Sequence, residues 1–280
     1  MIRILENGLQ VSPLFQTPWL TSDVFRVDWL HCADLGVTAD FLGNMFRLLA
    51  SKCEGNNVKQ KTHSLWKLVQ QFYADHNVGD KLQNLTPTMI QCSGKAPKLR
   101  CSAAQCRALL PFALKCAQTL LGDQPAEEAA KVAAWHLNQC YMALGDDSLF
   151  HHDVLKKSST LFALQYVALH DHFGNPKLWR CKPKLHLFLE LCAENSKPSL
   201  FWTYRDEDFG GSVAKAVRRR GGLLSCKAMS ANLLERMSIM QPVVRMTAPW
   251  KNWRIRWPLH VWGVNLQSFV HSNMLCHLIR

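Results

Sequence analysis

The chain has 280 residues, of which 48% are hydrophobic, and a formal net charge of +12. This composition can bury a large core, which excludes a disordered tail, and no apolar run is long enough to cross a bilayer. The positive charge favours a nucleic-acid partner, while the eleven cysteines, scattered without a repeated spacing, fit buried thiols in a reducing compartment. We therefore expect no membrane partner and an intracellular protein, nuclear if it binds DNA.

The first predicted elements are a strand and two helices. Residues 24–31 are rich in β-branched and aromatic side chains and predict a short strand that ends at Asp28. A helix is expected over residues 39–50, with Asp40 in its first turn. The polar stretch 51–64 predicts a loop, after which apolar residues follow helical spacing to about residue 76.

The middle of the chain predicts further helices from their end signals. Ser102 and Gln105 have the spacing of a capping box and predict a helix over 103–121. Asp123 and Gly145 mark the start and the end of the next helix. Helices are also expected over 154–173, 184–194, 205–220 and 230–240. Residues 64–180 should form a helical block with its own apolar centre, built from Trp66, Phe72, Leu110, Phe112, Trp135, Leu161 and Tyr166.

Two short segments stand apart from these helical patterns. The first is Asp28-Trp29-Leu30-His31, followed by Leu35-Gly36-Val37; the second is Lys182-Pro183-Lys184-Leu185-His186, which leads to Trp202 and then to Asp206-Glu207-Asp208-Phe209-Gly210-Gly211. In this order the motifs resemble those of transposases of the CACTA, Plavaka and Kyakuja-Dileera-Zisupton groups. The chain also resembles repeat-family proteins abundant in dinoflagellate genomes. The resemblance covers about residues 24–220, and it depends on the order of the motifs more than on any one of them.

The resemblance implies an RNase H-like fold in which Mg²⁺ or Mn²⁺ ions, held by three carboxylates, promote DNA cleavage and strand transfer. Asp28 matches the second carboxylate and Glu207 the third, with Asp206 and Asp208 as alternatives; His31 and His186 match positions near the site. Carboxylate oxygens suit Mg²⁺, and two ions can stabilise both the attacking and the leaving oxygen.

The expected fold is therefore mainly α with a small α/β part, a partial RNase H-like fold that carries a large helical insertion. Its parts would be 1–63, a partial RNase H-like segment; 64–180, the insertion; 181–240, returning helices with the acidic motif; and 241–280, an irregular tail rich in Trp and Arg.

Other interpretations of the same residues stay open. Asp28 could cap a turn, His31 could bind a buried carbonyl, and Glu207 could be a solvated acid in a first helical turn. The segment Asp208-Phe209-Gly210-Gly211 lacks the basic residue that the transposases usually carry there. Only 27 residues precede Asp28, too few for the strands that would bear the first carboxylate. We expect an inactive, transposase-derived fragment; the alternative is a non-catalytic helical interaction or DNA-binding protein.

The DNA-binding candidates are the cations Lys215, Arg218, Arg219 and Arg220, because guanidinium groups pair with phosphate oxygens. Alternatively, they offset the helix dipole before Gly221. The spacing of cysteines and histidines does not favour zinc. The sequence contains no Gly-rich phosphate loop and no Gly-x-Ser-x-Gly elbow, and we expect no small-molecule ligand.

Overall fold

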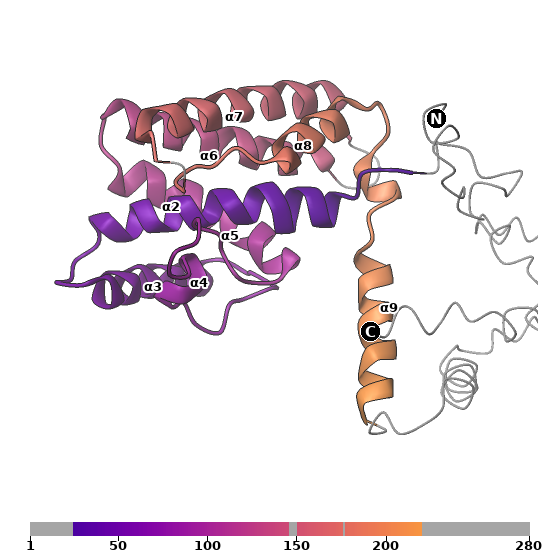
Figure 1. Ribbon diagram of the computed structural model, residues 1–280, viewed down its shortest axis with the longest axis horizontal. Helices are drawn as coiled ribbons and strands as arrows, with labels where there is room; N and C mark the ends of the chain where they lie inside the picture. The colour runs from indigo at the N-terminus through magenta and orange to yellow at the C-terminus, as the bar shows by residue number, and fades with distance from the viewer. Residues whose placement is uncertain (1–24, 146–149, 176, 220–280) are drawn as a thin grey trace, which may run out of the picture. The chain divides into compact units, whose positions relative to one another are not determined.

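The structure, a computed structural model, describes residues 25–145, 150–175 and 177–219. These residues are mainly helical, and no strand occurs among them (Figure 1). The expectation of a mainly α protein is thus confirmed. The chain divides into two compact units, residues 1–203 and 204–280. None of the described helices combines the length and the apolar character that a membrane span requires.

The first unit opens with a long helix of mixed type. Trp29 begins it, a π-helix η3 follows over Leu30–Thr38, and the α-helix α2 continues without a break over Ala39–Lys52. The strand predicted before Asp28 is wrong, because residues 25–28 are irregular. The aromatic content that suggested a strand serves helix packing, since the wholly buried Trp29 ring lies 5.6 Å from that of Tyr141 and 5.8 Å from that of Phe188.

The next helices follow some of the predicted end signals, and the short helix over Pro87–Ile90 was not predicted. The loop predicted over 51–64 is too long, because the Asn57 side chain accepts the amide of Gln60 and caps a helix that starts there. The capping box of Ser102 is confirmed. Asp123, however, does not cap the following helix, which begins at a proline after Gln124. These elements are α3 (Val58–Asp75), α4 (Pro87–Ile90), α5 (Ala103–Leu120) and α6 (Pro125–Leu144).

The remaining α-helices match the predicted helices to within about two residues, whereas the short 3-10 helix among these elements was not predicted. They are α7 (His152–Phe173), α8 (Pro183–Ala193) and the short 3-10 helix η4 (Pro198–Leu200) in the first unit, and α9 (Tyr204–Arg219) in the second. The predicted helix 230–240 and the irregular tail 241–280 lie outside the described residues.

The first unit is built around the rod formed by η3 and α2. In Figure 1, α3 and α4 lie on one side of this rod and α6, α7 and α8 on the other, and α5 also packs against it. The buried residues form one cluster that extends from Trp29 to Cys192. The apolar centre expected for residues 64–180 is therefore part of a core shared with the rod and with α8. Trp135, predicted to be in that core, is 46% exposed.

Candidate functional site

Asp28 stands at the start of the rod and accepts three hydrogen bonds. Its Oδ2 accepts the backbone amide of His31 at 2.9 Å and lies 2.6 Å from Nδ1 of the His31 ring. Its Oδ1 accepts the backbone amide of Thr203 at 2.9 Å. The bond to an amide three residues ahead is the geometry of a helix N-cap. The arrangement matches the alternative in which Asp28 is a cap.

The surroundings of Asp28 favour its ionised form. Partial burial alone would raise the pKa of this carboxyl, but the hydrogen bonds from His31 and Thr203 outweigh burial and lower the pKa below its usual value. Asp28 is therefore a carboxylate at neutral pH. The residue that holds its Oδ1, Thr203, is 175 positions away in the sequence, so the cap also connects the end of the first unit to the start of the rod.

The two motifs found in the sequence meet in space, although about 150 residues separate them. The Lys184 ammonium group donates to the carbonyl of His31 at 2.8 Å. In return, the thiol of Cys32 donates to the carbonyl of Lys184 at 3.5 Å. Gly36 permits this approach, because a Cβ atom there would lie only 2.8 Å from Cδ of Lys184. The second motif thus packs directly on the π-helix that follows the first.

Four cations surround Asp40 at this contact, and we call Lys98, Arg180, Lys182 and Lys184 the basic cluster. Lys182 forms an ion pair of 2.8 Å with Asp40, and Lys98 donates to the carbonyl of Leu35 at 2.6 Å. Arg180, Lys182, Lys184 and Asp40 line one small cleft. Burial lowers the pKa of Lys98; Asp40 opposes this shift, and Lys182 and Lys184 lower the pKa further. The direction of this shift is set first by burial, and the opposing effect of Asp40 and the effects of Lys182 and Lys184 show that these charged groups lie close enough to interact with Lys98.

A buried polar group lies behind this surface, on the inner side of η3. Asp34 is wholly buried, and the hydroxyl of Tyr141 donates to its Oδ1. Thr38 Oγ1 lies 2.7 Å from the same hydroxyl oxygen, so the Thr38 hydroxyl donates to Tyr141. The Arg107 guanidinium lies 5.6 Å from the centre of the Tyr141 ring and 5.7 Å from that of Trp202, a separation at which cations attract aromatic faces.

The other predicted site residues do not all join this cluster. His186 is exposed on α8 and pairs with Glu190 at 3.0 Å. Asp206 and Glu207 lie in the first turn of α9, and Asp208 follows them; all three are exposed.

These three acids belong to the second unit, as do the predicted DNA-binding residues. Lys215 is exposed on α9. Arg218 and Arg219 fall in the last turn of that helix, and Arg220 lies outside the described residues.

The hydrogen bonds of Asp28 do not favour a divalent metal of the kind that the resemblance implies. The Asp28 carboxylate already accepts two hydrogen bonds at Oδ2 and one at Oδ1, which leaves about one of its four lone-pair sites for a cation. Within the part of the chain that the structure describes, no group of three histidine, cysteine or acidic side chains is arranged to hold a metal ion.

Sequence reasoning missed Asp34, Tyr141, Arg107 and Lys98. One signal could have pointed to Asp34, namely an acidic residue inside the run from residue 29 to 37, in which His31 is the only other polar side chain. Tyr141, Arg107 and Lys98 lie on other elements, and nothing in the local sequence links them to the motifs.

Comparisons of this chain with protein families, with curated proteins and with solved structures find no match.

Proposed function

We propose that this chain is a non-catalytic, DNA-binding helical protein of transposase origin. One observation carries the proposal: the second motif places Lys182 and Lys184 beside Arg180 and Lys98, so that a cluster of four cations lies around a single carboxylate, Asp40. A crowded set of cations gains from a polyanion such as a DNA backbone, which neutralises the charges and releases counterions. Lys184 and Arg180 are exposed and can reach phosphate oxygens.

The non-catalytic part of the proposal is supported by the use that the fold makes of the motif residues. Asp28 caps the rod, Lys184 binds a carbonyl of η3, and Lys182 pairs with Asp40. Each of these side chains has a structural task in the first unit. This favours the interpretation that the motifs persist as architecture, and no step of phosphoryl transfer is assigned to them.

The transposase origin is supported by the motif order in the sequence. The RNase H-like segment and the role of residues 64–180 as an insertion remain predictions from that resemblance. In the proposed protein, the helices between the motifs serve to bring Asp28 and Lys184 together. This spatial contact gives a physical reason why the two motifs would be retained as a pair.

DNA binding is tested by fluorescence anisotropy with a labelled duplex, using the full chain over a series of salt concentrations. The variant Arg180→Gln/Lys184→Gln should bind more weakly, and the slope of log affinity against log salt should fall by roughly 0.9 for each lost phosphate contact. Lys115→Gln/Lys156→Gln is the matched control, because both lysines are exposed and lie outside the basic cluster.

The outcomes separate the two candidate DNA surfaces. The salt slope could instead change only when Arg218, Arg219 and Arg220 are replaced by Ala. That result would assign the DNA contact to the region of α9. Binding that does not depend on salt, or no binding, would refute the DNA partner. Circular dichroism of each variant verifies that it is folded.

Catalysis is tested separately with purified protein, Mg²⁺ or Mn²⁺, and labelled duplex or hairpin DNA. We expect no metal-dependent cleavage or strand transfer. A metal-dependent product that disappears in Glu207→Gln would contradict the proposal and identify the chain as an enzyme.

A further inference from the structure

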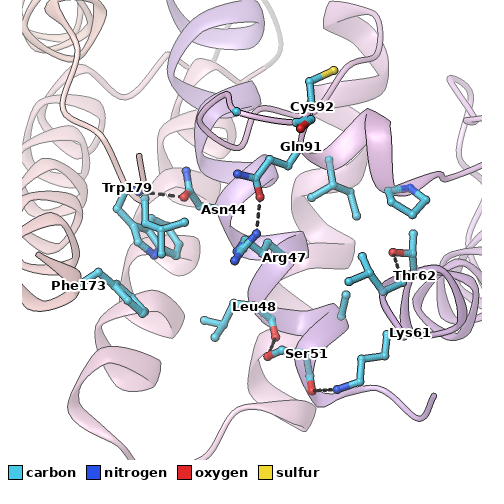
Figure 2. A pocket seen from close by; sticks show the side chains of 17 residues that line it. Asn44, Arg47, Leu48, Ser51, Lys61, Thr62, Gln91, Cys92, Phe173 and Trp179 are labelled. Atoms are coloured by element: carbon cyan, nitrogen blue, oxygen red, sulfur yellow. Dashed lines mark hydrogen bonds between the residues drawn. The ribbon is translucent and has the colours of Figure 1, made fainter. Parts of the chain in front are cut away.

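A pocket of about 570 Å³ lies at the far end of the rod from Asp28. It is formed by the second half of α2, the start of α3, the short helix α4 with the residues after it, and the end of α7 with the segment that follows (Figure 2). This volume is within the range of sites for small molecules, roughly 300–1,000 Å³. The pocket shares no residue with the basic cluster, so it is a separate feature of the first unit.

The polar part of the pocket is cationic. Arg47 and Lys61 line it, and no acidic side chain occurs among the described residues of its lining. Arg47 donates one hydrogen bond to the side-chain oxygen of Gln91. The amide nitrogen of Gln91 in turn donates to the carbonyl of Lys95 at 2.8 Å, which fixes the oxygen toward Arg47. Lys61 donates to the carbonyl of Ser51 at 3.3 Å.

These two cations keep donors for a ligand. A guanidinium carries five N–H groups and an ammonium three, and each side chain uses one of them in the bonds just described. Figure 2 shows Arg47 in the middle of the lining, with Lys61 on one side and Phe173 and Trp179 on the other. An anionic group between Arg47 and Lys61 would therefore meet hydrogen-bond donors on two sides.

The wall of the pocket formed by Phe173 and Trp179 is apolar, and the backbone of Trp179 has an unusual conformation. The rings of Phe173 and Trp179 are nearly parallel, with centroids 6.4 Å apart and an angle of 20° between their planes. Trp179 has a φ of +49°, which is uncommon for a bulky residue and has an energetic cost. Its backbone amide donates to Oδ1 of Asn44 at 2.9 Å, and Asn44 also lines the pocket. The fold thus maintains a strained residue at the wall of the pocket.

We propose that this pocket binds a small planar organic anion. Its acidic group, a carboxylate or a phosphate, pairs with Arg47 and Lys61, and its flat apolar body lies against Phe173 and Leu178. A metal cation does not fit, because two cations line the pocket and acids do not. The proposal replaces the expectation from sequence that the chain takes no small-molecule ligand, and it does not depend on the proposed DNA-binding function.

The test is isothermal titration calorimetry on the full chain with four probes. They are 2-naphthoate, the uncharged 2-naphthamide, adenosine monophosphate and inorganic phosphate. We expect saturable binding of 2-naphthoate or of adenosine monophosphate, with the successful probe identifying the acidic group. The amide should bind at least about fivefold more weakly than 2-naphthoate, because a hydrogen-bonded charge pair at a partly exposed site contributes about that much.

Variants assign the binding to the pocket. Arg47→Gln and Lys61→Gln should each weaken binding of the successful anion about fivefold or more. Arg100→Gln and Lys67→Gln, which replace exposed cations outside the pocket, should leave it unchanged. Thermal unfolding verifies that all four variants are folded.

Three results would overturn the proposal. The first is an absence of saturable binding by both organic anions. The second is equal binding of inorganic phosphate and the organic anions, which would remove the role of the apolar wall. The third is an equal loss of affinity in the pocket variants and in their controls, which would attribute the binding to the overall positive charge of the chain.

Discussion

Replacing Asp28 with Ala tests whether this residue is primarily a helix cap. The change removes the acceptor for the amides of His31 and Thr203 and the partner of the His31 ring. Loss of an N-cap side chain costs about 0.5–2 kcal/mol. The second amide, at a partly buried residue, adds about 1 kcal/mol when it loses its acceptor. We expect a loss of about 1.5–3 kcal/mol in the free energy of unfolding.

Urea unfolding at pH 7, followed by far-UV circular dichroism, measures this loss. Asp28→Asn is the matched variant, since its side-chain oxygen can still cap the helix although the charge is gone; it should lose about half as much. In a thermal scan, each kcal/mol corresponds to about 2–4 °C for a unit of this size.

Two results would refute the reasoning. One is an Asp28→Ala variant within about 0.5 kcal/mol of the original chain, which is the range of ordinary surface substitutions. The other is a clear rise of the original chain's Tm with Mg²⁺ that Asp28→Ala lacks. A ligand that binds the folded state raises stability by mass action, so this result would restore Asp28 as a metal ligand.

Further predictions concern acid, packing, capping and thiol chemistry. Because hydrogen bonds lower the pKa of Asp28 in the folded chain below its usual value of 3.8, its stabilisation is present above that value; the difference in unfolding free energy between the original chain and Asp28→Asn should shrink as pH falls through the folded pKa. Gly43→Ala should cost about 1–3 kcal/mol or more in urea unfolding, because the added Cβ would lie 2.4 Å from the backbone of Lys98. Ser102→Ala should cost about 1 kcal/mol in the same assay through loss of the capping box; a cost below about 0.3 kcal/mol would contradict its role. Burial raises the pKa of Cys32 to about 11, so native alkylation at pH 8, followed by mass spectrometry, should leave this thiol unmodified while unfolded protein reacts fully.

Local signals in the sequence predicted the helices well where they depend on hydrogen bonds between residues three or four positions apart. The capping box at Ser102 and the stop at Gly145 are of this kind, since their partners lie within one helical turn. The same chemistry was overlooked at Asn57, whose side chain caps α3 inside a stretch that composition alone assigned to a loop.

The errors come from features that depend on distant partners. Whether a run of bulky residues forms a strand or a helix was decided by Trp29, which fits between Tyr141 and Phe188 in the folded core. Trp135 follows the apolar period of α6 but faces outward. The spacing of apolar residues identifies the helix. Which face of the helix packs against a neighbouring element depends on the whole fold.

The candidate sites show the same division. The sequence singled out the segments of Asp28 and Lys184, and the structure brings them into contact. The sequence did not point to Lys98. This residue lies in a loop, 63 positions after Leu35, and donates to the Leu35 carbonyl in the π-helix. The pocket was beyond prediction, because its lining is drawn from four separated segments and its cations look like ordinary surface charges in the sequence.

The π-helix sets the angular phase between the two ends of the rod. An α-helix turns by about 100° per residue, whereas η3 uses wider turns over Leu30–Thr38 before α2 begins. Deleting one residue from η3 would therefore leave α2 in place only if Asp28 and His31 rotated by roughly that angle away from Thr203 and Lys184. The number of residues in η3 is thus fixed, and neither an insertion nor a deletion of one residue is tolerated, even at positions where the side chain can vary.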